Sequence, residues 1–378
     1  MKVIPAYLPQ YHQIPENDEW WGEGFTEWTN VKAAKPLFEG HQQPRVPMDN
    51  NYYDLTNVES LKWQCKIARE HGIYGFSMYH YWFNGKLLLE KPMELLLAHP
   101  EIDIHYCISW ANHEWTNGWK ASGKQVKTLI SINYNDENDW VAHFNYMLPF
   151  FKDPRYISED NKPFMIIYIP QLVTKLNDML KVWDQMAKDN GFDGLTFLYQ
   201  SAPAYTDHSW DRRQFKYGIL FNPDFALRAM GNSKKRKVND FIVKYASRIK
   251  SKLKIKRSLS FEKAGLKYYN YDEVWNTILT QMPITDNLIP SAYVDWDNTP
   301  RRENRGSVHI GASPEKFKKY FKALVEKTIR VSNQDKMFVF AWNEWAEGGY
   351  LEPDTRYGMG YLDAIKEVLT DLNLIEND

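Results

Sequence analysis

Short apolar runs recur along the chain and alternate with segments of helical period. Runs rich in β-branched and aromatic residues predict strands at 3–7, 73–79, 104–110, 164–169, 195–199, 288–294 and 337–342, with a weaker eighth strand at 217–221. Most of the gaps between them carry apolar residues three or four positions apart, which is typical of helices that cover a sheet. Strands that alternate with helices in this way indicate repeated βα units around a parallel sheet.

Local signals place the ends of some of these helices. Ser313 and Pro314 open one helix, because a proline at the first helical position costs no hydrogen bond. Asn190 and Gly191 end another. Eight strands, helices in most gaps and no obvious linker predict an α/β fold, a single (β/α)8 TIM barrel over residues 1–378. A doubly wound sheet is the alternative.

Two segments interrupt the repeat. Residues 9–54 are long, polar and aromatic, and they predict a long first βα loop at the active face. Residues 228–267 hold 14 Lys or Arg and only two acids, in a chain whose net charge is -1. We predict a basic helical insertion there, and contact between residues 234–257 and an anionic membrane surface. A solvated insertion packed on the barrel is the alternative interpretation.

Composition excludes several classes of protein. Hydrophobic residues at 43% and a net charge of -1 exclude global disorder and disfavour a nucleic-acid partner. Two cysteines, Cys65 and Cys107, are too few for a disulfide framework or a four-ligand zinc site. Neither a phosphate-binding glycine loop nor a metal-binding histidine motif occurs, so we expect no cofactor and no metal. The first residues resemble a strand without a secretory signal, which favours a cytoplasmic location, with a peripheral position at the inner face of the membrane.

Aromatic residues make up 15% of the chain, and many of them stand beside polar residues where a predicted strand ends. Catalytic groups of a parallel barrel lie at these ends. Sugars have apolar faces that stack on Trp or Tyr, and hydroxyls that need carboxylates, amides and imidazoles. We therefore predict a carbohydrate cleft. The candidate substrate-binding residues are Tyr11, His12, Trp28, Tyr79, His80, Trp82, Trp110, Asn112, His113, Glu114, Trp115, Tyr168, Asp295, Trp296, Asn343 and Trp345.

Glu344 and Glu347 are the sharpest candidates for catalysis, because they lie three residues apart just beyond the last predicted strand. Glycosidic cleavage commonly needs one acid to protonate the leaving oxygen and a second carboxylate at the sugar. The alternative is that they cap a helix or pair with an arginine. Their place at the end of a barrel strand favours catalysis.

Other candidate residues could have purely structural roles. His80 and Glu114 could satisfy hydrogen bonds within the barrel rim, and Trp28 could serve loop packing. Asp295 and Asp297 have the Asp-x-Asp spacing with which many glycosyltransferases hold a metal-bound nucleotide sugar. A tripeptide is weak support for that activity, and both acids could instead contact substrate.

Several aromatic motifs follow one another in order: Ala6 to His12, Trp20 to Gly22, Gly24 to Asn30, Tyr52 to Leu55, Tyr79 to Trp82, Trp110 to Trp115 and Ala341 to Trp345. Together they resemble the WbsX-type family of bacterial polysaccharide-biosynthesis proteins over almost the whole chain. That family is often labelled glycosyltransferase, and it is related to glycoside hydrolase family 99, endo-α-mannosidases with a (β/α)8 barrel.

The resemblance implies roles for the two glutamates. Glu344 would act as general base on the substrate 2-hydroxyl, forming a 1,2-anhydro sugar, and Glu347 as general acid and then base, with retention at the anomeric carbon. The leading prediction is thus a retaining glycosidase-like enzyme acting on a bacterial polysaccharide or its lipid-linked precursor. The alternatives are a glycosyltransferase of O-antigen or capsule polysaccharide biosynthesis, using Asp295 to Asp297, and a non-catalytic glycan-binding protein.

Overall fold

Eight parallel strands form the barrel of the computed structural model, which describes residues 1–118, 126–231 and 266–375. The sheet runs in the order β12, β10, β9, β8, β4, β2, β1, β15, β13. β12 pairs with β10 and β13 pairs with β15, and Pro290 alone separates β12 from β13, so one interrupted strand closes the ring. The bounds are β1 (Lys2–Tyr7), β2 (Gly75–Phe83), β4 (His105–Trp110), β8 (Lys162–Ile167), β9 (Thr196–Tyr199), β10 (Phe215–Ile219), β12 (Leu288–Ile289), β13 (Ser291–Tyr293) and β15 (Lys336–Phe340).

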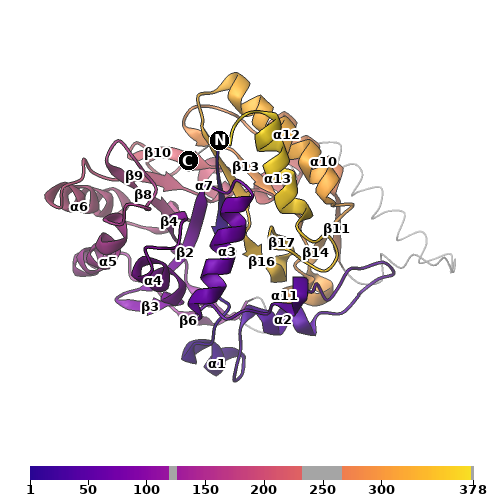
Figure 1. The fold of residues 1–378 in the computed structure, drawn as a ribbon. Helices are drawn as coiled ribbons and strands as arrows, with labels where there is room; N and C mark the ends of the chain where they lie inside the picture. Colours follow the sequence, from indigo (N-terminus) through magenta and orange to yellow (C-terminus); the bar gives the residue numbers. More distant parts are fainter. Residues whose placement is uncertain (119–125, 232–265, 376–378) are drawn as a thin grey trace, which may run out of the picture.

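Helices surround this ring (Figure 1). They are α3 (Val58–Glu70), α4 (Lys91–Ala98), α5 (Glu137–Phe151), α6 (Leu176–Asp189), α7 (Ala202–Thr206), α8 (Asp224–Gly231), α10 (Tyr271–Gln281), α12 (Pro314–Val331) and α13 (Gly360–Asp371). The predicted start of α12 is confirmed, since the Ser313 side chain accepts a hydrogen bond from the Lys316 amide at 3.3 Å. The predicted end of α6 is confirmed at Asn190.

All eight predicted strands are present, and the predicted (β/α)8 barrel is confirmed in preference to a doubly wound sheet. One strand is longer than predicted. β2 continues to Phe83 because Tyr81, Trp82 and Phe83 pair with the antiparallel strand β3 (Lys86–Leu88). The aromatic run expected to follow this strand therefore belongs to a hairpin.

Part of the aromatic surplus fills the space between the barrel and its helices. Trp275 of α10 is fully buried, and its ring stacks on Tyr320 of α12 at 5.6 Å between centroids and on Tyr293 of β13 at 5.5 Å. Such stacked rings remove large apolar areas from water and so stabilise the contact of helix and sheet.

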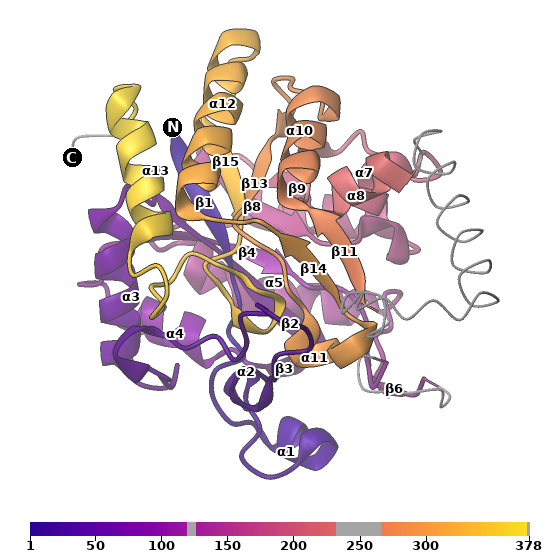
Figure 2. The same cartoon turned by 90° about the vertical axis from the view of Figure 1, so that its right-hand side faces the viewer.

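The long segment between β1 and α3 is the predicted first βα loop, and it contains α1 (Pro15–Trp21), α2 (Glu27–Ala33) and the short turn η1 (Met48–Asn50). Figures 1 and 2 show α1, α2 and the later α11 (Thr299–Arg302) at one end of the barrel, opposite the N-terminus. At that opposite end, the Met1 amino group donates to the Leu374 carbonyl at 3.0 Å. The first βα loop and α11 thus lie together at the carboxyl end of the strands.

The basic segment is described only at its edges. α8 ends at Gly231, and the chain continues at β11 (Lys267–Asn270), which pairs in parallel with β14 (Ser307–Ile310). The predicted membrane-contacting residues 234–257 lie outside the described residues. Within the described part of the chain, every helix is too short or too polar to cross a bilayer.

Candidate active site

Glu344 and Glu347 lie on a tight hairpin that follows the last barrel strand. β16 (Asn343–Glu344) pairs antiparallel with β17 (Gly349–Tyr350), and the turn η4 (Trp345–Glu347) joins them. Gly348 ends the turn with φ of 70°, and a side chain there would come within 2.7 Å of the Asp297 amide nitrogen. Glycine is needed for that left-handed, crowded position. The hairpin therefore holds both carboxyl groups over the carboxyl end of the barrel.

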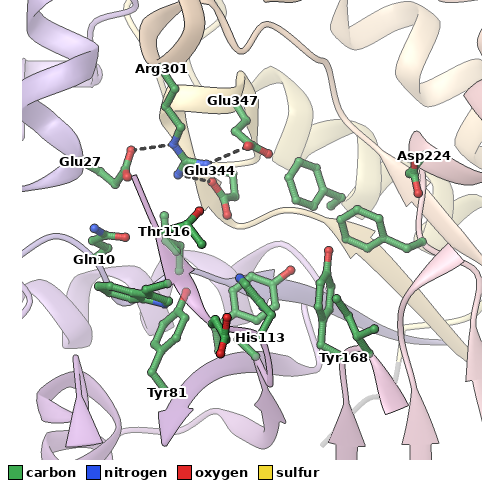
Figure 3. Close-up of a pocket in the computed structure, with 18 of the residues that line it drawn as sticks. Gln10, Glu27, Tyr81, His113, Thr116, Tyr168, Asp224, Arg301, Glu344 and Glu347 are labelled. Carbon is green, nitrogen blue, oxygen red and sulfur yellow. Dashed lines mark hydrogen bonds and ion pairs between the residues drawn. The ribbon is translucent and has the colours of Figure 1, made fainter. Parts of the chain in front are cut away.

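Arg301 of α11 binds three carboxylates at once (Figure 3). Its Nη1 donates to Glu347 Oε1 at 2.7 Å, and its Nη2 donates to Glu344 Oε2 at 3.0 Å. Its Nε donates to Glu27 Oε2 at 3.1 Å, from the first residue of α2. One of the three carboxyl groups comes from the first loop and two come from the last hairpin, and the arginine that binds them follows β13. One guanidinium cannot neutralise three carboxylates, so the cluster favours uptake of a proton.

The pKa of Glu344 reflects this crowding. Burial and the carboxylates of Glu347 and Glu27 together raise the pKa of Glu344 to about 8, against the opposing effect of Arg301. The Glu344 side chain is only 7% exposed, whereas that of Glu347 is 22% exposed. The two glutamates therefore differ in their access to water.

A pocket of about 600 Å³ opens in front of this cluster. Its walls combine aromatic rings with polar groups, as a sugar site requires. Tyr79, Tyr81 and Tyr168 line it, and burial raises the pKa of each phenol, so all three remain hydrogen-bond donors. Burial lowers the pKa of His113, which keeps that imidazole neutral. Figure 3 shows Tyr81 and His113 below the acidic cluster and Asp224 to one side.

Eight of the predicted site residues line this pocket together, namely Tyr79, His113, Glu114, Trp115, Tyr168, Trp296, Glu344 and Glu347. The other ten do not line it, namely Tyr11, His12, Trp28, His80, Trp82, Trp110, Asn112, Asp295, Asn343 and Trp345. Most of these ten are buried behind the wall, where they support it.

His80, Trp82 and Trp110 belong to one buried cluster around His143 of α5. The Nε2 atoms of His80 and His143 lie 2.9 Å apart, and Trp82 stacks flat on His143 at 4.6 Å. Trp110 contacts His143 edge to face at 5.0 Å. Burial lowers the pKa of His80 to about 3. A neutral histidine pair packed among indoles is a core arrangement, which is the structural role given for His80 above.

Two asparagines bridge neighbouring strands at their carboxyl ends. The Asn112 amide exchanges hydrogen bonds with the Ile169 amide and carbonyl at 2.7 and 2.8 Å. The Asn343 amide does the same with Leu8, at 2.7 Å and 2.9 Å. Each side chain replaces a pair of sheet hydrogen bonds, so both fix the rim from which pocket residues project.

The tyrosine and tryptophans beside the hairpin support it from below. The Tyr11 hydroxyl donates to the Asn343 carbonyl, and the Tyr11 ring packs 4.7 Å from that of Trp28. Trp28 in turn contacts Trp345 at 5.4 Å. His12 is 2% exposed, and among the described residues neither of its ring nitrogens has a hydrogen-bond partner.

Asp295 and Asp297 hold the chain at residues 41–45. Asp295 pairs with Arg45 at 2.8 Å, and Asp297 accepts from His41 and Gln43, both at 2.8 Å. These hydrogen bonds outweigh burial and hold the pKa of Asp297 at about 2. The acids are thus already occupied by protein cations and amides, which does not suit the metal site that their spacing suggested. Among the residues described, no cluster of three or more His, Cys, Asp or Glu could hold a metal ion.

The sequence analysis missed Arg301. Thr299 and Pro300 mark a helix start just after β13, and Asp297 caps it by accepting from the Thr299 amide at 3.1 Å. That signal places Arg301 at the active face but does not show which acids it binds. Glu27 and Asp224 also line the pocket.

The barrel is similar to solved glycoside hydrolases. The GH99 endo-α-mannosidase of Bacteroides thetaiotaomicron superposes with a TM-score of 0.56 at 12% identity, covering 100% of this chain and 98% of that one. The same enzyme in complex with bis-tris propane gives 0.55 at 11% identity, covering 98% and 97%. A glycoside hydrolase-like protein gives 0.52 at 12% identity, covering 91% and 99%. At such identities the likeness shows the fold alone.

Closer relatives are known by sequence. The uncharacterized protein WxcX of Xanthomonas campestris pv. campestris strain B100 is 32% identical over 375 residues, which is 97% of this chain and 49% of the relative. The WxcX protein of strain ATCC 33913 is 32% identical over 374 residues, with the same coverage. The chain therefore spans about half the length of the curated relatives it matches.

The family assignment covers nearly the whole barrel. The model of one family, described as Glycosyltransferase WbsX, matches residues 3–365, which include the first strand, the acidic hairpin and every pocket residue named above. The chain belongs to the WbsX glycosyltransferase family.

Proposed function

We propose that this protein is a retaining glycoside hydrolase-like enzyme that acts on a bacterial polysaccharide or its lipid-linked precursor. The observation that carries the proposal is the placement of Glu344 and Glu347 on one hairpin, both bound to Arg301, at the edge of an aromatic pocket. Two carboxyl groups beside one sugar-sized pocket supply the acid and the base of glycosidic cleavage.

In the proposed first step, Glu344 takes the proton of the substrate 2-hydroxyl and O2 attacks the anomeric carbon. The glycosidic bond breaks, and Glu347 protonates the leaving oxygen. In the second step, the Glu347 carboxylate takes a proton from water or from another sugar hydroxyl, whose oxygen attacks the anomeric carbon. The bond to O2 breaks, and Glu344 returns the proton to it. The same site supports hydrolysis or glycosyl transfer, depending on the acceptor.

Substitution of each glutamate tests this assignment. Glu344→Gln and Glu347→Gln should each lower turnover by about 10² to 10⁴ fold, because each removes one proton transfer. The measurement is product release by mass spectrometry from a panel of bacterial polysaccharides and lipid-linked oligosaccharides. Glu326→Gln, an exposed residue of α12, is the matched control and should be silent. Full turnover in both pocket variants would reject the proposal.

The pH profile tests the roles of the pair. The dependence of kcat/KM on pH follows the groups of the free enzyme. If Glu344 is the base, activity rises as pH increases through its pKa of about 8. A fall of activity over the same range would exchange the roles of Glu344 and Glu347.

The pocket charge supports a neutral or amino sugar over a nucleotide sugar. Its lining includes five carboxyl groups, of Glu27, Glu114, Asp224, Glu344 and Glu347, and two guanidinium groups, of Arg301 and Arg302. An added diphosphate would be repelled by this excess of carboxylates. The Bacteroides enzyme was solved with bis-tris propane, a polyhydroxylated diamine. We expect this compound to bind here too, as measured by calorimetry.

The family name supports a second candidate, a glycosyltransferase. A metal-dependent form of it would need free carboxylates at Asp295 and Asp297, which bind Arg45, His41 and Gln43 instead. Calorimetry with a nucleoside diphosphate and Mg²⁺ or Mn²⁺ separates the two, since the proposed enzyme should give no saturable heat. A non-catalytic glycan-binding protein would bind oligosaccharide without releasing any product.

We further propose that the enzyme works in the cytoplasm at the inner face of the membrane, bound there through residues 234–257. The excess of Lys and Arg in this segment supports attraction to anionic lipid. Flotation with phosphatidylserine vesicles at low and physiological salt tests the idea. Absence of vesicle binding at low salt would reject it.

A further inference from the structure

Another buried glutamate, Glu352, lies directly behind the hairpin. Glu352 is 2% exposed and follows β17 by two residues. Its Oε2 accepts hydrogen bonds from Trp345 Nε1 at 2.6 Å and from the Tyr53 hydroxyl at 2.8 Å, and its Oε1 accepts from Gln64 Nε2 at 2.7 Å. All three donors are neutral. A buried carboxylate bound by neutral donors is costly for stability, so the presence of a glutamate at position 352 needs an explanation.

The donors of Glu352 reach the hairpin at two points. Trp345 lies between Glu344 and Glu347 in sequence, and its ring stacks on Tyr350 at 3.8 Å with an interplanar angle of 12°. Tyr53 also accepts from Asn343 Nδ2 at 3.4 Å. Glu352 thus fixes both the turn and the first strand of the hairpin.

Gln64 ties the same network to the barrel wall. It lies on α3 and is fully buried. Its Oε1 accepts from the Tyr7 hydroxyl of β1 at 2.8 Å while its Nε2 donates to Glu352. The hairpin is thereby connected through one carboxylate to the first strand and to the helix that packs outside it.

We propose that Glu352 is a positioning residue that sets the place of Glu344 and Glu347 through Trp345 and Tyr53. Glu352 does not line the pocket, so it acts through the hairpin alone. The inference rests on the proposed function only in assigning work to the two glutamates. The positioning itself is a property of the folded chain and can be measured without substrate.

Exchanging the side chains of Gln64 and Glu352 tests the positioning role, because it exchanges a hydrogen-bond donor for an acceptor at each position. In Glu352→Gln, one amide nitrogen would face the Gln64 amide nitrogen, donor against donor. In the double variant Gln64→Glu/Glu352→Gln, every donor again has an acceptor: Glu at 64 accepts from Tyr7 and from Gln at 352, whose oxygen accepts from Trp345 and Tyr53. The double variant keeps the charge and nearly the same volume.

Backbone hydrogen exchange reports on the hairpin, and binding of bis-tris propane reports on the pocket. Glu352→Ala should speed backbone hydrogen exchange over residues 343–350 by about ten-fold and weaken bis-tris propane binding by about ten-fold. Glu352→Gln should show a smaller change in both, and the double variant should return to within about two-fold of the native protein. Asp153→Asn, a buried carboxylate at the other end of the barrel, is the control and should leave both unchanged.

Native exchange rates over 343–350 in both single variants would overturn the proposal, as would failure of a folded double variant to restore them. If Glu352→Ala does not fold, Glu352→Gln and the double variant still decide the matter. If the native protein does not bind bis-tris propane but the exchange rates respond as expected, the positioning role stands. In that case the expected ligand chemistry of the pocket is wrong.

Discussion

Two arginines, one near each end of the barrel, have partners that differ in charge. Arg155, before β8, binds Asp153 at 2.6 Å and donates to the backbone carbonyls of Leu96, His99 and Ile102 at 2.7 to 2.9 Å. The positive charge of Arg155 is balanced by the negative charge of Asp153, and the other N–H donors of Arg155 bind neutral carbonyl oxygens. Such a network stabilises the fold and leaves no charge over.

Arg301 at the carboxyl end is surrounded differently, because its three partners are all carboxyl groups. One carboxylate would be sufficient to balance the charge of an arginine that served only to stabilise the fold. Burial, with a further contribution from the two other carboxylates, raises the pKa of Glu344, whereas Arg155 outweighs burial and lowers the pKa of Asp153. Buried charge that is left unbalanced, beside a pocket, is typical of catalytic sites.

Of the two arginine substitutions, Arg301→Met should have the larger effect on turnover. We expect turnover to fall by about 100-fold, because the glutamates lose the cation that orients them. Affinity for the diamine bis-tris propane should rise instead, since the pocket becomes more negative. Turnover and calorimetry on one preparation check both, and unchanged turnover would show that Arg301 is dispensable.

Arg155→Met should have the converse effect. It leaves Asp153 and three carbonyls without their donor, which costs on the order of 3 kcal/mol of the free energy of unfolding. Denaturant unfolding measures this loss. Binding of bis-tris propane, measured below the unfolding transition, should equal that of the native protein. A change in affinity would mean that the two ends of the barrel are coupled.

The two ends should also respond to pH in opposite directions. Glu344, whose pKa is about 8 when folded, holds a proton that the unfolded chain releases near pH 4. Its contribution to stability is therefore present below about pH 4 and is lost as pH rises to about 8. Asp153 has a lowered pKa, so its contribution is present above about pH 4 and is lost on acidification.

Unfolding midpoints at a series of pH values test this contrast. Glu344→Gln should flatten the fall in stability between about pH 5 and pH 8, and Asp153→Asn should flatten only the acid side. Identical profiles for the two variants would contradict the assignment of opposite shifts.

The smallest expected effect is at the pocket rim. Glu114 lines the pocket but is exposed, and it accepts a long hydrogen bond of 3.4 Å from Thr128. Glu114→Gln should weaken bis-tris propane binding by about two-fold at low salt and leave it unchanged at high salt, because exposed charges are screened. A larger effect that persists in salt would place Glu114 inside the binding site proper.

Prediction from sequence succeeded where one local pattern was sufficient. The strands follow from apolar runs, and the place of Glu344 and Glu347 follows from their position after the last of them. Trp82 and Trp110 show what a local pattern does not record. Both stand beside polar residues at strand ends, as pocket residues do, yet both pack on His143 of α5, a helix whose sequence gives no sign of that contact.

Local sequence patterns were sufficient to predict the barrel and the place of Glu344 and Glu347 after its last strand, because each depends on residues close together in the chain. Only the tertiary structure decided which groups meet. Glu27, Arg301 and Glu347 are separated by up to 320 positions, and they meet because β15 pairs with both β1 and β13. The contacts of Glu352 with Tyr53, and those of Asp295 and Asp297 with Arg45 and His41, likewise join residues far apart in the chain. Long-range contacts of this kind arise from packing of the whole chain, which no local pattern records.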